Sequence, residues 1–391
     1  MSQFDLEIDR RNTGSYKWEV SENELPMWVA DMDFKTAPEI IEALKKRVEH
    51  GVFGYSVIPE EWYEAYRSWW SRRHSFDIRK EWLMFCTGVV PAISSVVRKL
   101  TTPAENVIVI TPAYNIFFNS IYNNGRNIVE SRLIYEDGAY RIDFSDLEEK
   151  CRDPQSTLLI LCNPHNPTGI LWDKETLLHI GVICAQNHVT VLSDEIHCDL
   201  TLPGREYVPF ASVSELCQMN SVTCIAPTKT FNIAGLQTAA ICIPNPVLRH
   251  KVWRGINTDE VAEGNVFAAD AAIAAFTYGE PWLCELREYL AKNRAYAEDF
   301  IAKEIPKLKA VHAEATYLLW IDCAGCSTQS GEFAAFIRRT TGLYLCEGGE
   351  YRGDGEHFLR MNLACPKSRL KDGLLRLKRA VALWCSEPRR E

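Results

Sequence analysis

Lys229 stands at a position where the sequence predicts a nucleophile. It lies in residues 226–236, Ala-Pro-Thr-Lys-Thr-Phe-Asn-Ile-Ala-Gly-Leu, directly after an apolar run at 222–226 that predicts a buried strand. Open α/β sheets bind ligands in the crevice beyond the carboxyl ends of their strands. A lysine there, beside hydroxyls and an aromatic ring, suits a Schiff-base nucleophile. An ordinary exposed lysine is the alternative, and the neighbouring motifs decide between the two.

Two further strand ends carry groups that suit a flat, phosphorylated ligand. After residues 83–86 comes Thr-Gly-Val-Val-Pro, a turn that opens a helix whose free N–H groups could hold a phosphate. After residues 107–110 comes Thr-Pro-Ala-Tyr, in which the ring of Tyr114 could stack on a planar ligand. Each signal is weak alone, because many such turns contain a glycine and a tyrosine can simply cap a helix.

Two more strand ends supply an amide and a carboxylate. Residues 163–169 read Asn-Pro-His-Asn-Pro-Thr-Gly. Each proline restricts the residue before it, so this rigid turn is expected to aim Asn163 or Asn166 at something. Residues 194–197 read Asp-Glu-Ile-His, where the acid either serves a ligand or caps a helix.

Together these groups match the needs of pyridoxal 5′-phosphate. The lysine would form an imine, and the carboxylate would pair with the protonated pyridine nitrogen. The asparagine and His197 would bond the ring oxygen, and backbone amides would take the phosphate. The sequence therefore predicts a cofactor site built at the carboxyl edge of one sheet.

The elements that must position this site alternate strand and helix, which predicts an α/β fold with a mostly parallel seven-stranded sheet flanked by helices. The expected strands are 83–86, 107–110, 127–133, 157–162, 189–193, 222–226 and 238–243. After about residue 280 a long helix, 282–305, leads to shorter strands at 317–321, 343–346 and 358–363, which indicates a smaller α+β domain. We expect a large cofactor-binding domain at 50–280 and a small domain formed by 1–49 with 281–391.

The N-terminal part contains a loop, a helix and an aromatic stripe. Residues 26–34, Pro-Met-Trp-Val-Ala-Asp-Met-Asp-Phe, follow no helical or strand period and indicate a loop with a functional role. Thr36 and Glu39 resemble a capping box before a helix that Gly51 would end. The aromatic side chains at helical spacing that follow are expected to be core packing: Trp62, Tyr63, Tyr66, Trp69 and Trp70.

Composition narrows the possible partners. The formal net charge of -9 argues against nucleic-acid or anionic-membrane binding. No apolar run approaches the roughly 20 residues of a membrane span, and residues 1–12 lack the apolar core of a signal peptide. The fourteen cysteines are scattered, as expected for reduced thiols in a cytoplasm. Cys323 and Cys326 form a lone C-x-x-C without a second pair, so no metal site is expected.

Four motifs together resemble the fold-type I aminotransferase superfamily, which depends on pyridoxal 5′-phosphate: residues 163–169, 193–197, 227–237 and 358–366. Residues 26–34 together with Asp-Glu-Ile-His resemble the cystathionine β-lyase, or C–S lyase, branch. The resemblance runs from about residue 20 to 385.

The resemblance implies that five residues contact the cofactor ring. It implies that Lys229 forms the imine and moves the substrate's α-proton, and that Asp194 partners the pyridine nitrogen. Asn166 is implied to contact the ring oxygen and the substrate, while His197 stands where many aminotransferases have a tyrosine for the same oxygen. Tyr114 resembles the ring-stacking aromatic, and with Lys229 and Asp194 it completes the implied catalytic group.

The resemblance also implies which residues bind the phosphate: the backbone amides of Val89 and Val90 and the hydroxyl of Thr228. It implies that Arg360 and Ala30 bind the amino-acid substrate. Tyr55 matches a tyrosine that reaches the phosphate from the neighbouring subunit, which implies a homodimer with shared active sites.

One position departs from the aminotransferase pattern. Many members carry an arginine eight residues after the lysine, paired with the phosphate, and this chain has Gln237 there. The C–S lyase branch also lacks the arginine, and the balance of the phosphate charge stays open at this stage.

The expected reaction is β-elimination from L-cystathionine or related cysteine S-conjugates to a thiol, pyruvate and ammonia. An aminotransferase of class I or II is the near alternative, because both reactions start from the same carbanion. No second arginine is identifiable for a distal carboxylate, which disfavours a dicarboxylate transaminase. A cofactor-sensing regulator is a third possibility, but only about 25 residues precede the motifs, too few for a helix-turn-helix module.

Overall fold

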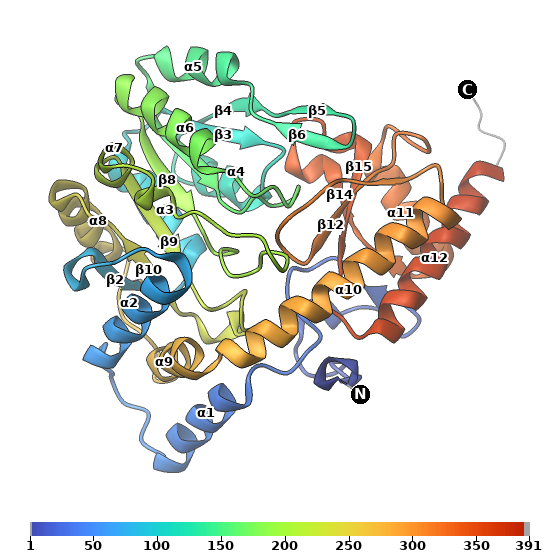
Figure 1. The fold of residues 1–391 in the computed structure, drawn as a ribbon, viewed down its shortest axis with the longest axis horizontal. Helices are drawn as coiled ribbons and strands as arrows, with labels where there is room; N and C mark the ends of the chain where they lie inside the picture. Colours follow the sequence, from blue (N-terminus) through green and yellow to red (C-terminus); the bar gives the residue numbers. More distant parts are fainter. Residues whose placement is uncertain (1, 387–391) are drawn as a thin grey trace.

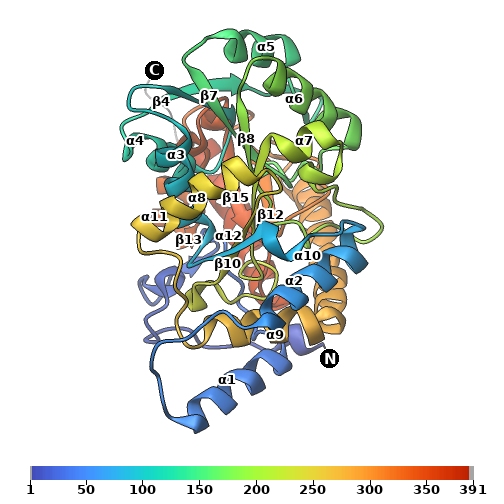
Figure 2. The same cartoon turned by 90° about the vertical axis from the view of Figure 1, so that its left-hand side faces the viewer.

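The computed structural model describes residues 2–386 and is organised around one large sheet (Figures 1 and 2). Its strand order is β2-β10-β9-β8-β7-β3-β4. All neighbouring strands pair in parallel except β10, which runs antiparallel to both of its neighbours. The strands are β2 (Leu83–Cys86), β3 (Asn106–Thr111), β4 (Asn127–Arg132), β7 (Ser156–Cys162), β8 (Thr190–Asp194), β9 (Ser221–Ile225) and β10 (Ala239–Cys242). The predicted seven-stranded, mostly parallel sheet is confirmed.

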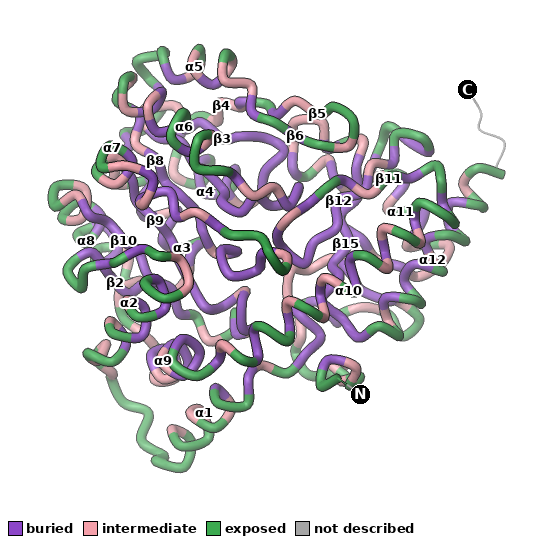
Figure 3. Tube along the Cα trace, viewed as in Figure 1, coloured by how far each residue is buried: buried purple, intermediate pink, exposed green. Residues whose placement is uncertain are grey.

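Helices cover both faces of this sheet, so all its strands except the edge strand β4 are buried along most of their length (Figure 3). One apolar cluster joins the sheet to α3 (Val89–Leu100), α4 (Asn115–Tyr122) and α8 (Pro246–Thr258). Another joins it to α5 (Phe144–Arg152), α6 (Lys174–Gln186) and α7 (Glu215–Met219). A hairpin, β5 (Ile134–Glu136) with β6 (Ala139–Arg141), follows β4. Burial on both faces explains why the strands are continuous apolar runs in the sequence.

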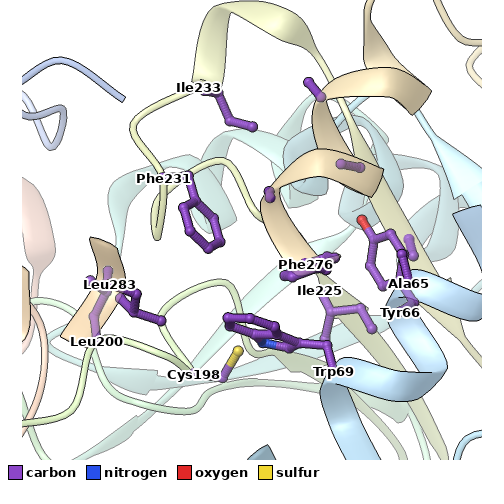
Figure 4. Packing of buried hydrophobic residues seen from close by; sticks show 14 of the residues in the cluster. Ala65, Tyr66, Trp69, Cys198, Leu200, Ile225, Phe231, Ile233, Phe276 and Leu283 are labelled. Carbon is purple, nitrogen blue, oxygen red and sulfur yellow. The ribbon is translucent and has the colours of Figure 1, made fainter. Parts of the chain in front are cut away.

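The aromatic stripe packs in the core, as the sequence predicted. It lies on α2 (Glu60–His74), which packs against α9 (Ala268–Tyr278). Four of its five aromatic side chains are buried: Trp62, Tyr66, Trp69 and Trp70. The fifth, Tyr63, is half-buried. Figure 4 shows Trp69 beside Phe231 and Phe276, with ring centroids 5.9 and 5.1 Å away. This cluster connects α2 to the loop that carries Lys229.

A smaller antiparallel sheet has the order β11-β12-β15-β14. Its strands are β11 (Lys309–Ala310), β12 (Leu318–Asp322), β14 (Cys346–Glu347) and β15 (Phe358–Asn362), and its helices are α10 (Glu280–Glu304), α11 (Ser330–Thr341) and α12 (Lys367–Ser386). In Figure 1, α10 runs from beside α9 to this second sheet. The proposed domain boundaries at 49 and 280 stay a prediction.

The structure divides one predicted strand. Instead of a single strand at 343–346, β13 (Leu343–Tyr344) pairs with β1 (Leu25–Pro26), while β14 pairs with β15. The pairing with β1 joins the N-terminal segment to the C-terminal part of the chain. An apolar run of four residues cannot reveal that its two halves have different partners.

The predicted capping box at the first helix is wrong. Helix α1 (Pro38–His50) has Ala37 as its N-cap, and no side chain caps it. Pro38 occupies the first turn, where its missing N–H leaves one fewer donor to satisfy, so the start needs no threonine cap. The Thr36 hydroxyl is buried without a hydrogen-bond partner in the described chain. The predicted helix end at Gly51 is confirmed, with a φ of 75°.

No helix in residues 2–386 has the length and apolarity that a membrane crossing requires.

Candidate active site

A cavity of about 270 Å³ lies at the carboxyl ends of β7, β8 and β9, beside the start of α3. Nine of the predicted site residues line it: Ala30, Val89, Val90, Tyr114, Asn166, Asp194, His197, Thr228 and Lys229. They come from segments far apart in the chain. The structure therefore brings together the groups that the strand ends predicted.

Lys229 is held in this cavity by the packing of its own loop. Phe231, two residues further on, is fully buried among Trp69, Phe276 and Trp282 (Figure 4). The Lys229 amine donates a hydrogen bond of 2.6 Å to the Ala30 carbonyl.

The Lys229 amine also has a lowered pKa, about 8. Burial is the main cause and the Arg360 charge adds to it, while Asp31 and Asp194 oppose it. A lowered pKa raises the neutral fraction of the amine near physiological pH, which suits a group that acts as nucleophile and base.

Asp194 ends β8 and is a buried carboxylate without a cationic partner in the described chain. Its side chain accepts one hydrogen bond, 3.1 Å long, from the Ile196 N–H. Burial raises the pKa of the Asp194 carboxyl to about 7, although the Ile196 N–H and Lys229 act in the opposite direction. A buried carboxylate normally has a cation beside it, so this cavity is suited to a ligand that supplies one.

His197 is a neutral imidazole at the cavity wall. Burial, helped by the charges of Lys229 and Arg360, lowers its pKa to about 3. Its Nδ1 atom is buried and has no hydrogen-bond partner within residues 2–386. A neutral ring with one unpaired nitrogen can donate to or accept from a ligand oxygen.

Arg360 is not among the residues that line the cavity, but it bonds Asn166, which does. Arg360, on β15, donates from Nη1 to the Asn166 Oδ1 over 3.2 Å and from Nη2 to the Trp28 carbonyl over 2.7 Å. Its guanidinium is buried, and its Nε has no partner in the part of the chain that the structure describes. Nη2 also donates to the Cys346 Sγ over 3.3 Å, and a buried cation that meets no carboxylate within residues 2–386 is ready to bind one.

The start of α3 forms the opposite end of the cavity. Gly88 is its N-cap and places no side chain over the helix end, so no side chain satisfies the first backbone N–H groups. Thr228 and Gln237 line the same cavity. A helix N-terminus with free amides favours an anion there.

Tyr55 lies away from this cavity. It is in the loop between α1 and α2, is fully exposed, and does not line the site of its own chain. Figures 1 and 2 show this loop projecting from the body of the molecule.

Sequence reasoning missed several residues that the structure adds. The cavity wall includes Cys162 and Ile196. Cys162 is the register partner of Asp194 on the neighbouring strand, so pairing the two strand ends could have found it. Tyr317 donates to the Ala30 carbonyl, and nothing in its local sequence signals that contact.

One group of potential metal ligands is present in the described chain, outside this cavity. His74, Cys198 and Asp199 bring one ligand atom each within 4.8 Å of one another. Asp199 already accepts hydrogen bonds from Trp69 and His74 and forms an ion pair with Arg73, 3.3 Å away. This carboxylate is therefore compensated by protein groups.

A mostly parallel sheet with Lys229 and the buried Asp194 at its carboxyl edge, and an arginine of the second sheet bonded to Asn166 beside them, has the arrangement of a fold-type I enzyme. The chain belongs to the aminotransferase class I and II family, whose family model matches residues 23–377.

Relatives cover nearly the whole chain. It is 43% identical over 385 residues to cystathionine beta-lyase PatB of Bacillus subtilis, which spans 97% of this chain and 100% of that protein. Among solved structures, cystalysin of Treponema denticola with its pyridoxal 5′-phosphate cofactor is 36% identical, with a TM-score of 0.95 over 98% of this chain and 99% of that one. The PLP-bound C–S lyase of Staphylococcus hominis is 33% identical, with a TM-score of 0.90 over 97% and 98% of the two chains.

Proposed function

We propose that this chain is a pyridoxal 5′-phosphate-dependent C–S β-lyase. It cleaves L-cystathionine or related cysteine S-conjugates by β-elimination to a thiol, pyruvate and ammonia. The observation that carries the proposal is a half-buried lysine and a buried carboxylate without an ion pair on one cavity, in a chain that matches named cystathionine β-lyases and C–S lyases over nearly its whole length.

The cavity fits the cofactor at both ends. Asp194 forms no ion pair within residues 2–386, although the Lys229 charge lowers its pKa, and it would pair with the protonated pyridine nitrogen. The free amides of Val89 and Val90, with the Thr228 hydroxyl, would hold the phosphate. Tyr114 would contact the ring, and Asn166 and His197 would serve its oxygen. When bound, the cofactor supplies an electron sink that stabilises negative charge at the substrate's Cα.

The protein's own residues bind the substrate and move its proton. Arg360 holds the α-carboxylate with its planar fork, steadied by Asn166 and by the Trp28 carbonyl. The neutral amine of Lys229 takes the proton from Cα at its Nζ atom. Burial of the site keeps water from competing for that proton.

The alternative is an aminotransferase, which would use the same residues. The two activities differ in what they require: a lyase releases pyruvate from cystathionine alone, whereas a transaminase needs a keto-acid acceptor. The test incubates purified protein with L-cystathionine and no acceptor, and follows pyruvate and free thiol. Equal amounts of both support the lyase, and product that forms only after a keto acid is added would show a transaminase.

The first mutational prediction concerns Arg360. Arg360→Lys keeps the positive charge but loses the fork that two carboxylate oxygens can share. We expect KM to rise about 10- to 100-fold for every amino-acid substrate, as for the loss of a hydrogen bond to a charged group. Steady-state kinetics with cystathionine and a second cysteine conjugate measures this. A rise for only one of the two would place Arg360 against the side chain instead.

The active unit in this proposal is a homodimer with shared sites. The loop between α1 and α2 exposes an unusual set of apolar side chains: Val52, Phe53, Tyr55 and Val57. With Gln237 in place of an arginine, the phosphate needs other donors, and Tyr55 from a second copy would supply one. A two-fold dimer would build two equivalent sites in this way.

The second mutational prediction tests this arrangement. Tyr55→Ala and Lys229→Ala homodimers should each be largely inactive, and mixing them should restore activity. The reason is that a hybrid in which Tyr55 acts across the interface has one intact site and one with both lesions. Activity is measured after mixing and subunit exchange. If Tyr55 acted within its own chain, every hybrid site would carry one lesion and mixing would restore nothing.

The proposal also places the enzyme in the cytoplasm, with neither nucleic acid nor membrane as partner. The net charge of -9 and fourteen cysteines without disulfides support it.

A further inference from the structure

The Ala30 carbonyl accepts two hydrogen bonds at once inside the site. Lys229 donates from Nζ over 2.6 Å, and Tyr317 donates from its hydroxyl over 2.9 Å. Tyr317 is almost fully buried, at 1% exposure, and lies just before β12. Both donors therefore meet one acceptor away from bulk water.

We propose that Tyr317 is a positioning residue for the proton transfer, and that residues 29–31 form a fixed dock for the Lys229 amine whenever that amine is free. The inference rests on the proposed function and deepens it. It also gives a role to the loop at 26–34, which shows no helical or strand period in the sequence.

Hydrogen bonds on both sides of Ala30 hold the dock in place, so it does not move with the lysine side chain. Asn362 donates from its side-chain nitrogen to the Val29 and Asp31 carbonyls, each over 2.6 Å. These carbonyls flank Ala30 in the chain. One amide thus fixes the two peptide groups next to the acceptor.

A second asparagine fixes the following residues. Asn232, three residues after Lys229, accepts from the Met32 N–H over 2.9 Å. Its side-chain nitrogen donates to the Met32 and Phe34 carbonyls over 3.0 and 2.9 Å. The loop that carries the lysine and the loop that carries its acceptor are therefore tied to each other.

Ion pairs complete the support of the dock. Asp31 pairs with Arg10 over 2.6 Å and with the buried Lys17 over 3.6 Å. Lys17 also pairs with Asp33 over 3.2 Å. The aspartates of the loop are thus neutralised by the N-terminal segment.

The Tyr317 hydroxyl restricts the direction from which the Lys229 amine can bond the Ala30 carbonyl. A carbonyl oxygen has two lone pairs, and a donor that holds one of them confines the other donor to the second. An amine whose Cε and whose N–H to Ala30 are both held in place has only two tetrahedral positions left for its lone pair. In the proposal one of these positions faces the substrate's Cα–H, so that the C–H bond breaks, the proton passes to Nζ, and the electron pair stays with the substrate.

Tyr317→Phe tests the proposal because it removes only the hydroxyl and keeps the buried ring. The matched control is Tyr140→Phe. Tyr140 lies on β6, outside the cavity, and its buried hydroxyl donates to Asp354. Four quantities are measured in both variants: kcat, KM, the kinetic isotope effect with α-deuterated substrate, and the rate at which cofactor-free protein gains visible absorbance on mixing with pyridoxal 5′-phosphate.

We expect kcat of Tyr317→Phe to fall about 10- to 100-fold, the scale of a reacting group that has lost its alignment. KM should change little, the isotope effect should rise, and the gain of visible absorbance should slow. Tyr140→Phe should leave the isotope effect and the loading rate at wild-type values. Wild-type isotope effect and loading rate in Tyr317→Phe would overturn the proposal, and so would equal changes in both variants.

The loading rate needs no substrate, so the two proposals fail separately. If the wild type releases no pyruvate from cystathionine while Tyr317→Phe still loads slowly, the lyase is wrong and the dock stands. If the wild type is a lyase and Tyr317→Phe matches it in every quantity, the dock is wrong.

Discussion

Replacement of Lys229 by alanine is expected to lower β-lyase activity by at least about 10⁴-fold, the upper end of what a positioned proton carrier contributes. The change removes the atom that would bond the cofactor and the base that takes the substrate's proton. Among residues 2–386, no other lysine lines the cavity. Pyruvate release from cystathionine measures the loss.

A direct chemical test accompanies the kinetics. Borohydride treatment of the wild type should fix the cofactor to the peptide that contains Lys229, as peptide mass analysis would show. The control is Lys251→Ala, which removes an exposed lysine on α8 and should leave activity and labelling unchanged. Labelling of another lysine in the wild type would contradict the assignment.

The sheet was predictable because it is buried on both faces. Such strands are nearly continuous apolar runs, and helix-length segments separate most of them, so their positions emerge to within about one residue. The site followed from the same rule. Asp194 ends β8 and Lys229 follows the end of β9 by four residues, and parallel strands bring their carboxyl ends to one edge.

Contacts between distant segments were not predictable. Ala30 and Lys229 are 199 residues apart, and Ala30 and Tyr317 are 287 apart, so no local pattern links them. The sequence marked residues 26–34 only as an aperiodic loop, and the folded chain shows which carbonyl the lysine meets. The same limit explains the divided strand at 343–346, where two neighbouring pairs of residues join different partners.

The failed capping box has a more local cause. Thr36 and Glu39 have the right spacing, but Pro38 between them starts the helix with Ala37 as N-cap. The motif alone therefore misplaced the cap by one residue. Tyr55 is a different case, because its predicted contact is with a second copy of the chain and a single chain cannot display it.

Asp194→Asn is expected to reduce lyase activity about 10²- to 10³-fold, the scale for losing one preorganised electrostatic contact. Asparagine has the same shape but no charge, so it cannot keep a pyridine nitrogen protonated. Steady-state kinetics measures the loss, and cofactor absorbance shows whether binding survives. Near-normal turnover in a loaded Asp194→Asn protein would contradict the role assigned to this carboxylate.

The same substitution should have the opposite effect on the stability of the cofactor-free protein. Burial raises the pKa of Asp194 to about 7 from 3.8, so the folded state holds a proton that the unfolded state has released. The stability linked to this group is complete below about pH 4 and is lost as the pH rises to about 7. Asp194→Asn removes that loss, which amounts to at most a few kcal/mol at about 1.4 kcal/mol per pKa unit. Glu195, whose pKa burial also raises to about 7, titrates in both proteins, so the difference in stability between them isolates Asp194.

Thermal melts without cofactor should therefore show a higher Tm for Asp194→Asn at pH 8 and similar values near pH 4. Added cofactor should stabilise the wild type more than the variant, because only the wild type offers a carboxylate to its cation. An equal or lower Tm for the cofactor-free variant at pH 8 would mean that Asp194 is compensated within the protein.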